Sequence, residues 1–189
     1  MTLLILGLVL FLGIHSLPIF ALATRDRLVA SLGRNGWRGV HSLFALAGLV
    51  LIVVGFGQAR HAPIVLYSPP VWMHHITFLV MLPVFPLMFA AYLPCWTKVW
   101  LKHPMLVAVK TWAFAHLLSN GTLADVLLFG GFLAWAVADR ISLKRRQPEP
   151  NIHTVPKIMY DVLAMVAGLA LYAAVLGWLH RWLIGVPLI

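Results

Sequence analysis

Long apolar runs separated by short polar and basic segments extend along almost the whole chain. Each run is long enough, or nearly so, to cross the roughly 30 Å hydrocarbon core of a bilayer as a helix. The pattern therefore predicts an all-α polytopic membrane bundle of about six transmembrane helices, built as a single membrane domain over residues 1–189. The six predicted helices cover residues 2–23, 40–58, 74–95, 104–120, 122–139 and 158–180.

The fourth and fifth runs are separated only by the polar sequence Ser119-Asn120-Gly121-Thr122, which predicts a tight helical hairpin. We expect Gly121 to end the fourth helix in the left-handed conformation that glycine tolerates. We expect Thr122 to cap the fifth helix, with Asp125 three residues later as its partner in a capping box.

Basic residues are distributed unevenly between the runs. The chain has 14 Lys and Arg against five Asp and Glu, a formal net charge of +9, which in a soluble protein would suggest nucleic-acid binding. With 62% hydrophobic residues the chain does not resemble a soluble domain, and no nucleic-acid partner is expected. Twelve basic residues lie in or beside the odd-numbered connections and two lie on the other side. The positive-inside rule therefore places both termini outside, in the periplasm of a bacterium with this protein in its inner membrane.

Two of the nine histidines, His15 and His116, lie inside apolar runs. Ionisable side chains at membrane depth are costly and are commonly functional. At 1.5 Å per residue His15 lies roughly 12 Å, and His116 roughly 18 Å, from the cytoplasmic end of its helix. Helix tilt can absorb that offset, and two facing imidazoles without acidic neighbours suit a haem iron. The alternative is that each ring bonds to a carbonyl group of a neighbouring helix and holds no cofactor.

Three polar-capable residues surround His116 in the sequence. Trp112, His116 and Asn120 follow one another at four-residue spacing and so share a helix face. Asp125 lies across the hairpin turn at similar depth and could accept the second ring N–H of His116, its alternative role being the helix cap described above. His103 precedes Pro104, and a proline in the first turn marks the start of a helix. No nucleophile–base or paired-carboxylate pattern is found, so no catalytic residue is assigned.

Five motifs together resemble the NnrU family of integral membrane proteins. The similarity covers about residues 7–146, so that residues 158–180 form an additional C-terminal helix. The resemblance implies a denitrification accessory protein of the bacterial inner membrane, acting beside a nitric oxide or nitrite reductase system. The motifs are Gly13-Ile14-His15-Ser16, residues 33–39, His103-Pro104-Met105, residues 112–121 and Asp139-Arg140.

The plant zeta-carotene isomerase, a membrane haem-b enzyme that isomerises a cis double bond, is a distant relative of this family. Its haem-ligand histidines lie in motifs that match His15 and His116, so the resemblance implies these two residues as axial ligands of haem b. A third family histidine matches His103. The isomerase has a cysteine three residues before its second ligand, where this chain has Ala113. No role is carried over to His41.

Three functions follow from these observations. The first is a haem-b protein associated with nitrite and nitric oxide metabolism, and the second is a haem-dependent cis–trans isomerase of a polyene such as zeta-carotene. The third is a small-molecule membrane carrier, suggested only by Pro83, Pro86 and Pro94, which predict a bent or broken third helix. Membrane lipid surrounds the protein in all three cases.

Overall fold

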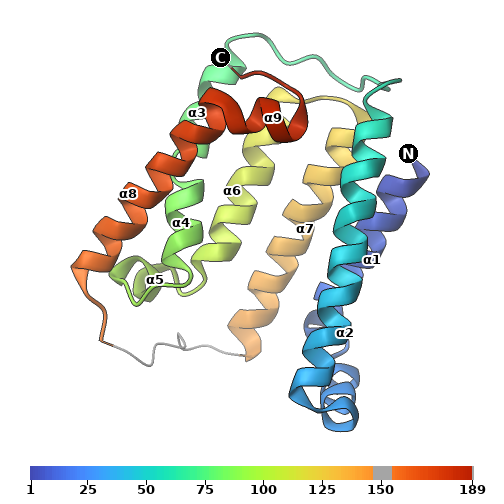
Figure 1. The fold of residues 1–189 in the computed structure, drawn as a ribbon, viewed down its shortest axis with the longest axis vertical. Coiled ribbons are helices and arrows are strands. Elements are labelled where there is room, and N and C mark those ends of the chain that lie inside the picture. The colour runs from blue at the N-terminus through green and yellow to red at the C-terminus, as the bar shows by residue number, and fades with distance from the viewer. Residues whose placement is uncertain (147–154, 189) are drawn as a thin grey trace.

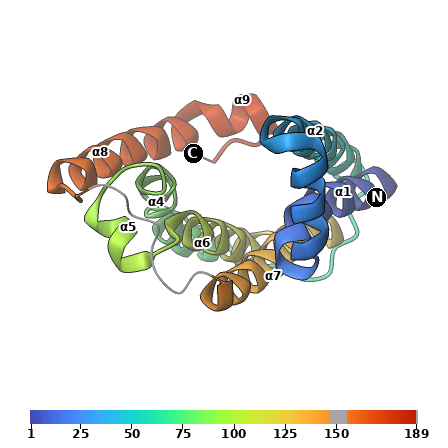
Figure 2. The ribbon, with the colours of Figure 1, turned by 90° about the horizontal axis from the view of Figure 1, so that it is seen from below.

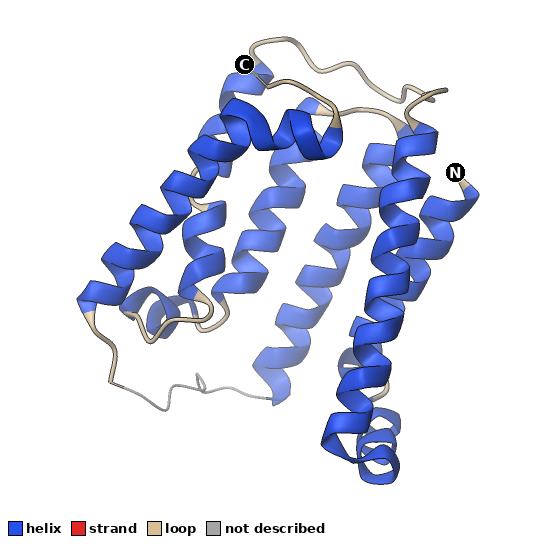
Figure 3. Cartoon of the chain, viewed as in Figure 1, coloured by secondary structure: helices blue, strands red, loops and turns tan. Residues whose placement is uncertain are grey.

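The structure, a computed structural model, describes residues 1–146 and 155–188. In these residues the regular structure is helical, and an isolated β-bridge joins Val65 to Thr122. The predicted all-α class is therefore confirmed (Figures 1 and 3). The helices are α1 (Thr2–Phe20), α2 (Leu22–Ala59), α3 (Met73–Met81), α4 (Val84–Ala90), α5 (Trp96–Leu101), α6 (Pro104–Ser119), α7 (Leu123–Arg146), α8 (Ile158–Ala174), the π-helical turn η1 (Val175–Leu179) and α9 (His180–Ile184).

Five helical segments are long and apolar enough to cross a membrane. They expose large apolar side chains, such as Val9 at 66% and Leu43 at 66%, that a water-soluble protein would bury. The chain is therefore a membrane protein. The fourth predicted run forms α6, whose 16 residues are fewer than those of any of the five. The five segments are α1, α2, Met73–Ala90, α7 and Ile158–Ile184.

The long helices stand side by side around an arc, as Figure 2 shows. Helix α1 packs between α2 and α7, α6 packs between α7 and the α3–α4 pair, and α8 packs on α4. A hydrogen bond joins α2 to α9, the two ends of the arc: Nη1 of Arg60 donates to the carbonyl group of Ile184 at 2.6 Å. Both termini lie at one end of the bundle, and the start of α2, the short α5 and the end of α7 lie at the other (Figure 1).

Helices α1 and α2 approach each other closely because glycines lie at their contact. A Cβ atom on Gly7 would lie 2.6 Å from the backbone nitrogen of Ile52, and one on Gly48 would lie 2.7 Å from that of Phe11. Small residues at such positions let helix backbones pack together in a membrane. The contact fixes the position of His15, which lies two turns after Gly7 on α1.

The basic segment between the first two predicted runs is helical, whereas the sequence pattern places residues 24–39 in a connection. Helix α2 begins at Leu22, and its helical course is broken at Gly33, where φ is 71° and ψ is 166°. Arginine, leucine and alanine favour helix, and glycine adopts a positive φ without steric cost. The segment is therefore a bent helix at the end of the bundle.

The predicted distortion of the third run is confirmed, because α3 ends at Met81 and α4 begins after Pro83. The hairpin between α6 and α7 is also present, with one correction. Gly121 is not among the glycines with a positive φ, so the left-handed cap predicted for it is wrong. Glycine is required there because the carbonyl group of Tyr67 occupies the place of a Cβ atom.

Candidate functional site

His15 lies near the end of α1, with one ring nitrogen held by its own helix. Nδ1 lies 2.7 Å from the carbonyl oxygen of Phe11, and the ring stacks on the Phe11 ring with centroids 4.4 Å apart. Because a carbonyl oxygen only accepts, Nδ1 carries the hydrogen and donates it. Nε2 of His15 therefore retains a lone pair that can bind a metal.

His116 has the same arrangement on α6. Its Nδ1 donates to the carbonyl group of Trp112 at 2.8 Å, and its ring stacks on Phe129 of α7 with centroids 4.5 Å apart. A carbonyl bond of this kind fixes the tautomer of histidines that bind metals through the other nitrogen. His74 and His180 also donate Nδ1–H to carbonyl groups, at 3.0 Å and 2.8 Å, so the bond alone does not identify a ligand.

Aromatic side chains lie between the rings of His15 and His116. Phe132 of α7 contacts Phe11 beside His15 and Trp112 beside His116, with centroids 5.6 Å apart in both pairs. The two histidines are thus joined by an apolar, aromatic series and do not contact each other directly.

The contacts of each histidine with α7 give its position along the bundle. The His15 ring lies 6.0 Å from Trp135 and the His116 ring 4.5 Å from Phe129, centroid to centroid. These two α7 residues are six positions apart, roughly 9 Å at 1.5 Å per residue. Two axial nitrogens on one iron lie about 4 Å apart, since each metal–imidazole bond is about 2 Å. The rings are therefore staggered, not face to face.

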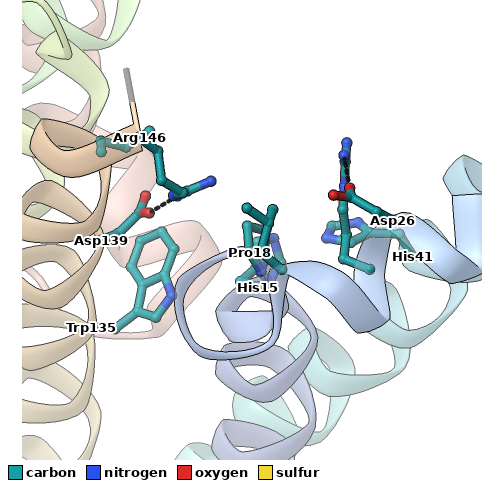
Figure 4. Close-up of a pocket in the computed structure, with 10 residues that line it drawn as sticks. His15, Pro18, Asp26, His41, Trp135, Asp139 and Arg146 are labelled. Atoms are coloured by element: carbon teal, nitrogen blue, oxygen red, sulfur yellow. Dashed lines mark hydrogen bonds and ion pairs between the residues drawn. The ribbon is translucent and has the colours of Figure 1, made fainter. Parts of the chain in front are cut away.

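A cavity of about 590 Å³ adjoins His15 at the end of the bundle that carries the basic residues (Figure 4). Helix α2 contributes His41, whose ring lies edge-on to His15 with centroids 4.7 Å apart. Helix α7 contributes Trp135 and Asp139. The Asp139 carboxylate forms an ion pair with the guanidinium group of Arg146, at 3.4 Å. The sequence does not identify His41 as a site residue. It lies in a basic, interfacial segment, and the sequence does not show which helix packs against it.

Asp125 and Asn120 cap helices. Oδ2 of Asp125 accepts hydrogen bonds from the Thr122 backbone N–H at 3.0 Å and the Thr122 hydroxyl at 2.6 Å, which confirms the predicted capping box. The Asn120 amide donates to the backbone carbonyl group of His116 at 2.9 Å. The tautomer of His116 is thus fixed by Trp112, the residue one turn before it.

His103 lies apart from His116, at the opposite end of α6. It precedes the helix, and its Nε2 is buried without a hydrogen-bond partner in the described part of the chain. Burial lowers the pKa of His103. The positive charges of Arg140 and Lys102 lower this pKa further, whereas the negative charge of Asp139 raises it. His103 is therefore neutral at pH 7.

The described residues offer two imidazole nitrogens and no cluster of ligands for a bare ion. Across residues 1–146 and 155–188 no three His, Cys, Asp or Glu side chains are grouped so that they could hold a metal ion. Haem iron needs only axial ligands from the protein, because the porphyrin supplies the others. His15 and His116 each keep Nε2 outside these carbonyl bonds and lie beside aromatic rings.

A family model with the description NnrU protein matches residues 3–188, which extends beyond residues 7–146 and includes the C-terminal helices. No curated protein and no solved structure matches the chain.

Proposed function

The chain belongs to the NnrU family, and from this premise we propose that it is a membrane protein that binds haem b through His15 and His116. The observation that carries the proposal is the combination of this tautomer with position, since both residues lie inside apolar helices and are linked by the aromatic series through Phe132. Each donates Nδ1–H to the carbonyl group four residues earlier and keeps Nε2 as a donor atom. Both residues lie on helices that pack against α7.

The residues around the two histidines suit a haem pocket. Phe11, Trp112 and Phe132 provide apolar, aromatic surface between the two proposed ligands. Because the rings are staggered along α7, both can bind one iron only after the residues between them rearrange. When bound, haem supplies an iron that binds small diatomic molecules or transfers electrons.

We assign the protein an accessory role in nitrite and nitric oxide metabolism, beside a nitric oxide or nitrite reductase system. Family membership supports this role, since the family is associated with that metabolism. A second candidate is a haem-dependent cis–trans isomerase of a polyene such as zeta-carotene. The aromatic series from Phe11 through Phe132 to Trp112 favours it, because flat conjugated chains pack well on aromatic rings.

We further propose six crossings of the bacterial inner membrane, with both termini in the periplasm. Helix α6 adds the sixth crossing, since its 16 residues extend about 24 Å and it packs against α3, α4 and α7. The termini share one end of the bundle, and the basic start of α2 and end of α7 share the other, as the positive-inside rule requires (Figure 1). Periplasm-active reporter fusions at both termini test this topology, and a cytoplasm-active fusion at either end overturns it.

Absorption spectra of the purified full-length protein test the haem proposal. We expect a Soret band in protein produced with a haem precursor, and its loss or conversion to a high-spin spectrum in His15→Ala and His116→Ala. His74→Ala is the matched control, because this exposed histidine also donates Nδ1–H to a carbonyl group and should leave the band unchanged. An unchanged band in both ligand variants, or protein without haem after supplementation, contradicts the proposal.

Two assays separate the candidate functions once haem is present. Nitric oxide should shift the Soret band of the reduced protein if the accessory role is correct. Conversion of tri-cis zeta-carotene by the wild type, and its loss in His15→Ala, would instead establish the isomerase. A protein that converts the polyene and shows no response to nitric oxide contradicts the accessory role.

A further inference from the structure

A second cavity, of about 600 Å³, lies at the basic end of the bundle beside the one that contains His15. Its walls come from Pro18 of α1 and from both arms of the bent helix α2. Arg25 lies on the arm before Gly33, and Arg34 and Arg38 lie on the arm after it. In a straight helix Arg25 and Arg34 would be roughly 13.5 Å apart along the axis, at 1.5 Å per residue. The bend at Gly33 brings them to one cavity.

The charges around this cavity are unbalanced. Arg25 is paired with its exposed neighbour Asp26 at 2.8 Å. Within the part of the chain that the structure describes, neither Arg34 nor Arg38 forms an ion pair. These two arginines are four residues apart on a helix, a spacing at which like charges repel. No carboxylate of the described residues lines this cavity. Asp26 and Asp139 line the adjacent one, where they are already paired with Arg25 and Arg146.

Neutral hydrogen-bond donors and a buried tryptophan side chain also line the cavity. The Ser42 hydroxyl and the His41 ring line it, and Trp37, which is only 8% exposed, packs against His41 with ring centroids 5.9 Å apart. Guanidinium groups bind phosphate oxygens in pairs, which gives both affinity and a defined orientation. Two unpaired arginines with a hydroxyl and an imidazole beside them form a site for a phosphate group.

The position of the cavity in the bundle indicates where that phosphate comes from. The cavity lies where the apolar run of α1 ends and before the apolar part of α2 begins, which is the level of the lipid headgroups. Basic pockets between helices at this level hold anionic headgroups. We propose that Arg34 and Arg38, with His41 and Ser42, bind the phosphate group of an anionic phospholipid. The argument for this site does not use haem, and the two sites share His41, which also contacts His15.

Thermal unfolding of the full chain in neutral detergent tests this site. We expect phosphatidylglycerol to raise the melting temperature of the wild type more than phosphatidylcholine does. In Arg34→Gln/Arg38→Gln the affinity for phosphatidylglycerol should fall about tenfold or more, since charge-assisted contacts of this kind are worth about 1.4 kcal/mol or more together. The variant Arg27→Gln/Lys144→Gln is the matched control, because it removes the same charge from exposed residues outside the cavity.

Each outcome decides the proposal. Equal losses in the test and control variants would show diffuse attraction to the basic surface and overturn the site. Stabilisation by millimolar inorganic phosphate, with no response to phosphatidylglycerol, would overturn the lipid as its occupant. If the glutamine variant does not yield folded protein, Arg34→Lys/Arg38→Lys replaces it. The lysine pair keeps the charge but loses the paired contacts, so we expect a lower affinity for phosphatidylglycerol, and an unchanged affinity would contradict the site.

Discussion

The ring of His41 lies edge-on to that of His15, with centroids 4.7 Å apart and an angle of 76° between the ring planes. The contact joins the middle of α2 to the end of α1, beside the cavity shown in Figure 4. It places a second imidazole next to a proposed haem ligand. Because the two rings are in edge contact, we expect His41 to act as a packing neighbour of His15 and not as a second ligand.

Replacement of His41 tests whether it is a packing neighbour of His15 or a haem ligand. His41→Phe keeps a ring of similar shape, so we expect it to retain the Soret band and the wild-type melting temperature. His41→Ala should retain the band but lose about 1 kcal/mol of stability, because the edge contacts with His15 and Trp37 are removed. Absorption spectra and thermal unfolding measure both effects. Loss of the Soret band in His41→Phe would instead make His41 a ligand.

Glycine at position 7 should be essential for the contact between α1 and α2. Gly7→Ala places a Cβ atom 2.6 Å from the Ile52 backbone nitrogen, so the helices must separate, at a cost of about 1–3 kcal/mol. Gly57→Ala is the control on α2, since nothing lies within 4 Å of the added atom. Thermal unfolding in detergent should show destabilisation by the first substitution only. Equal melting temperatures for the two variants would contradict the close packing.

Asp161 should stabilise the bundle by holding the start of α5 against α8. Its carboxylate accepts hydrogen bonds from the backbone N–H groups of Trp96 and Thr97, both at 2.9 Å, and from the Thr97 hydroxyl at 2.7 Å. Asp161→Ala leaves three donors without this acceptor, and we expect a loss of about 1–3 kcal/mol. Asp26→Ala, which removes an exposed surface ion pair, should change stability by less than about 0.5 kcal/mol. Chemical or thermal unfolding that ranks the two variants equally would contradict this role.

His103 should make the protein less stable in mild acid. Its pKa is lowered in the folded protein by burial and by Arg140 and Lys102, so below about pH 6.5 the unfolded chain binds a proton that the folded chain does not. Stability contributed by neutral His103 is thus present above that pH and is lost as the pH falls through the folded pKa. His103→Gln should reduce the drop in melting temperature between pH 7.5 and pH 5.5. The same drop in wild type and variant would contradict the lowered pKa.

Local features of the fold followed directly from the sequence. The hairpin after Asn120 and the capping box of Thr122 and Asp125 depend on residues within three positions of each other. The sequence alone therefore predicts them. The break of the third run at Pro83 has the same character, since proline removes a donor from its own helix. By contrast, the role of Gly121 depends on Tyr67, more than 50 positions away, and only the folded chain shows it.

The candidate site also combines features that the sequence determines with features that depend on tertiary packing. Hydropathy is a property of each segment by itself, so the sequence determined which segments become apolar helices and which histidines, His15 and His116, lie within them. The rotation and stagger of each helix depend on packing against its neighbours. Only the tertiary structure therefore decided that His15 contacts His41, that Phe132 lies between the two proposed ligands, and that the bend at Gly33 directs Arg25 and Arg34 to one cavity.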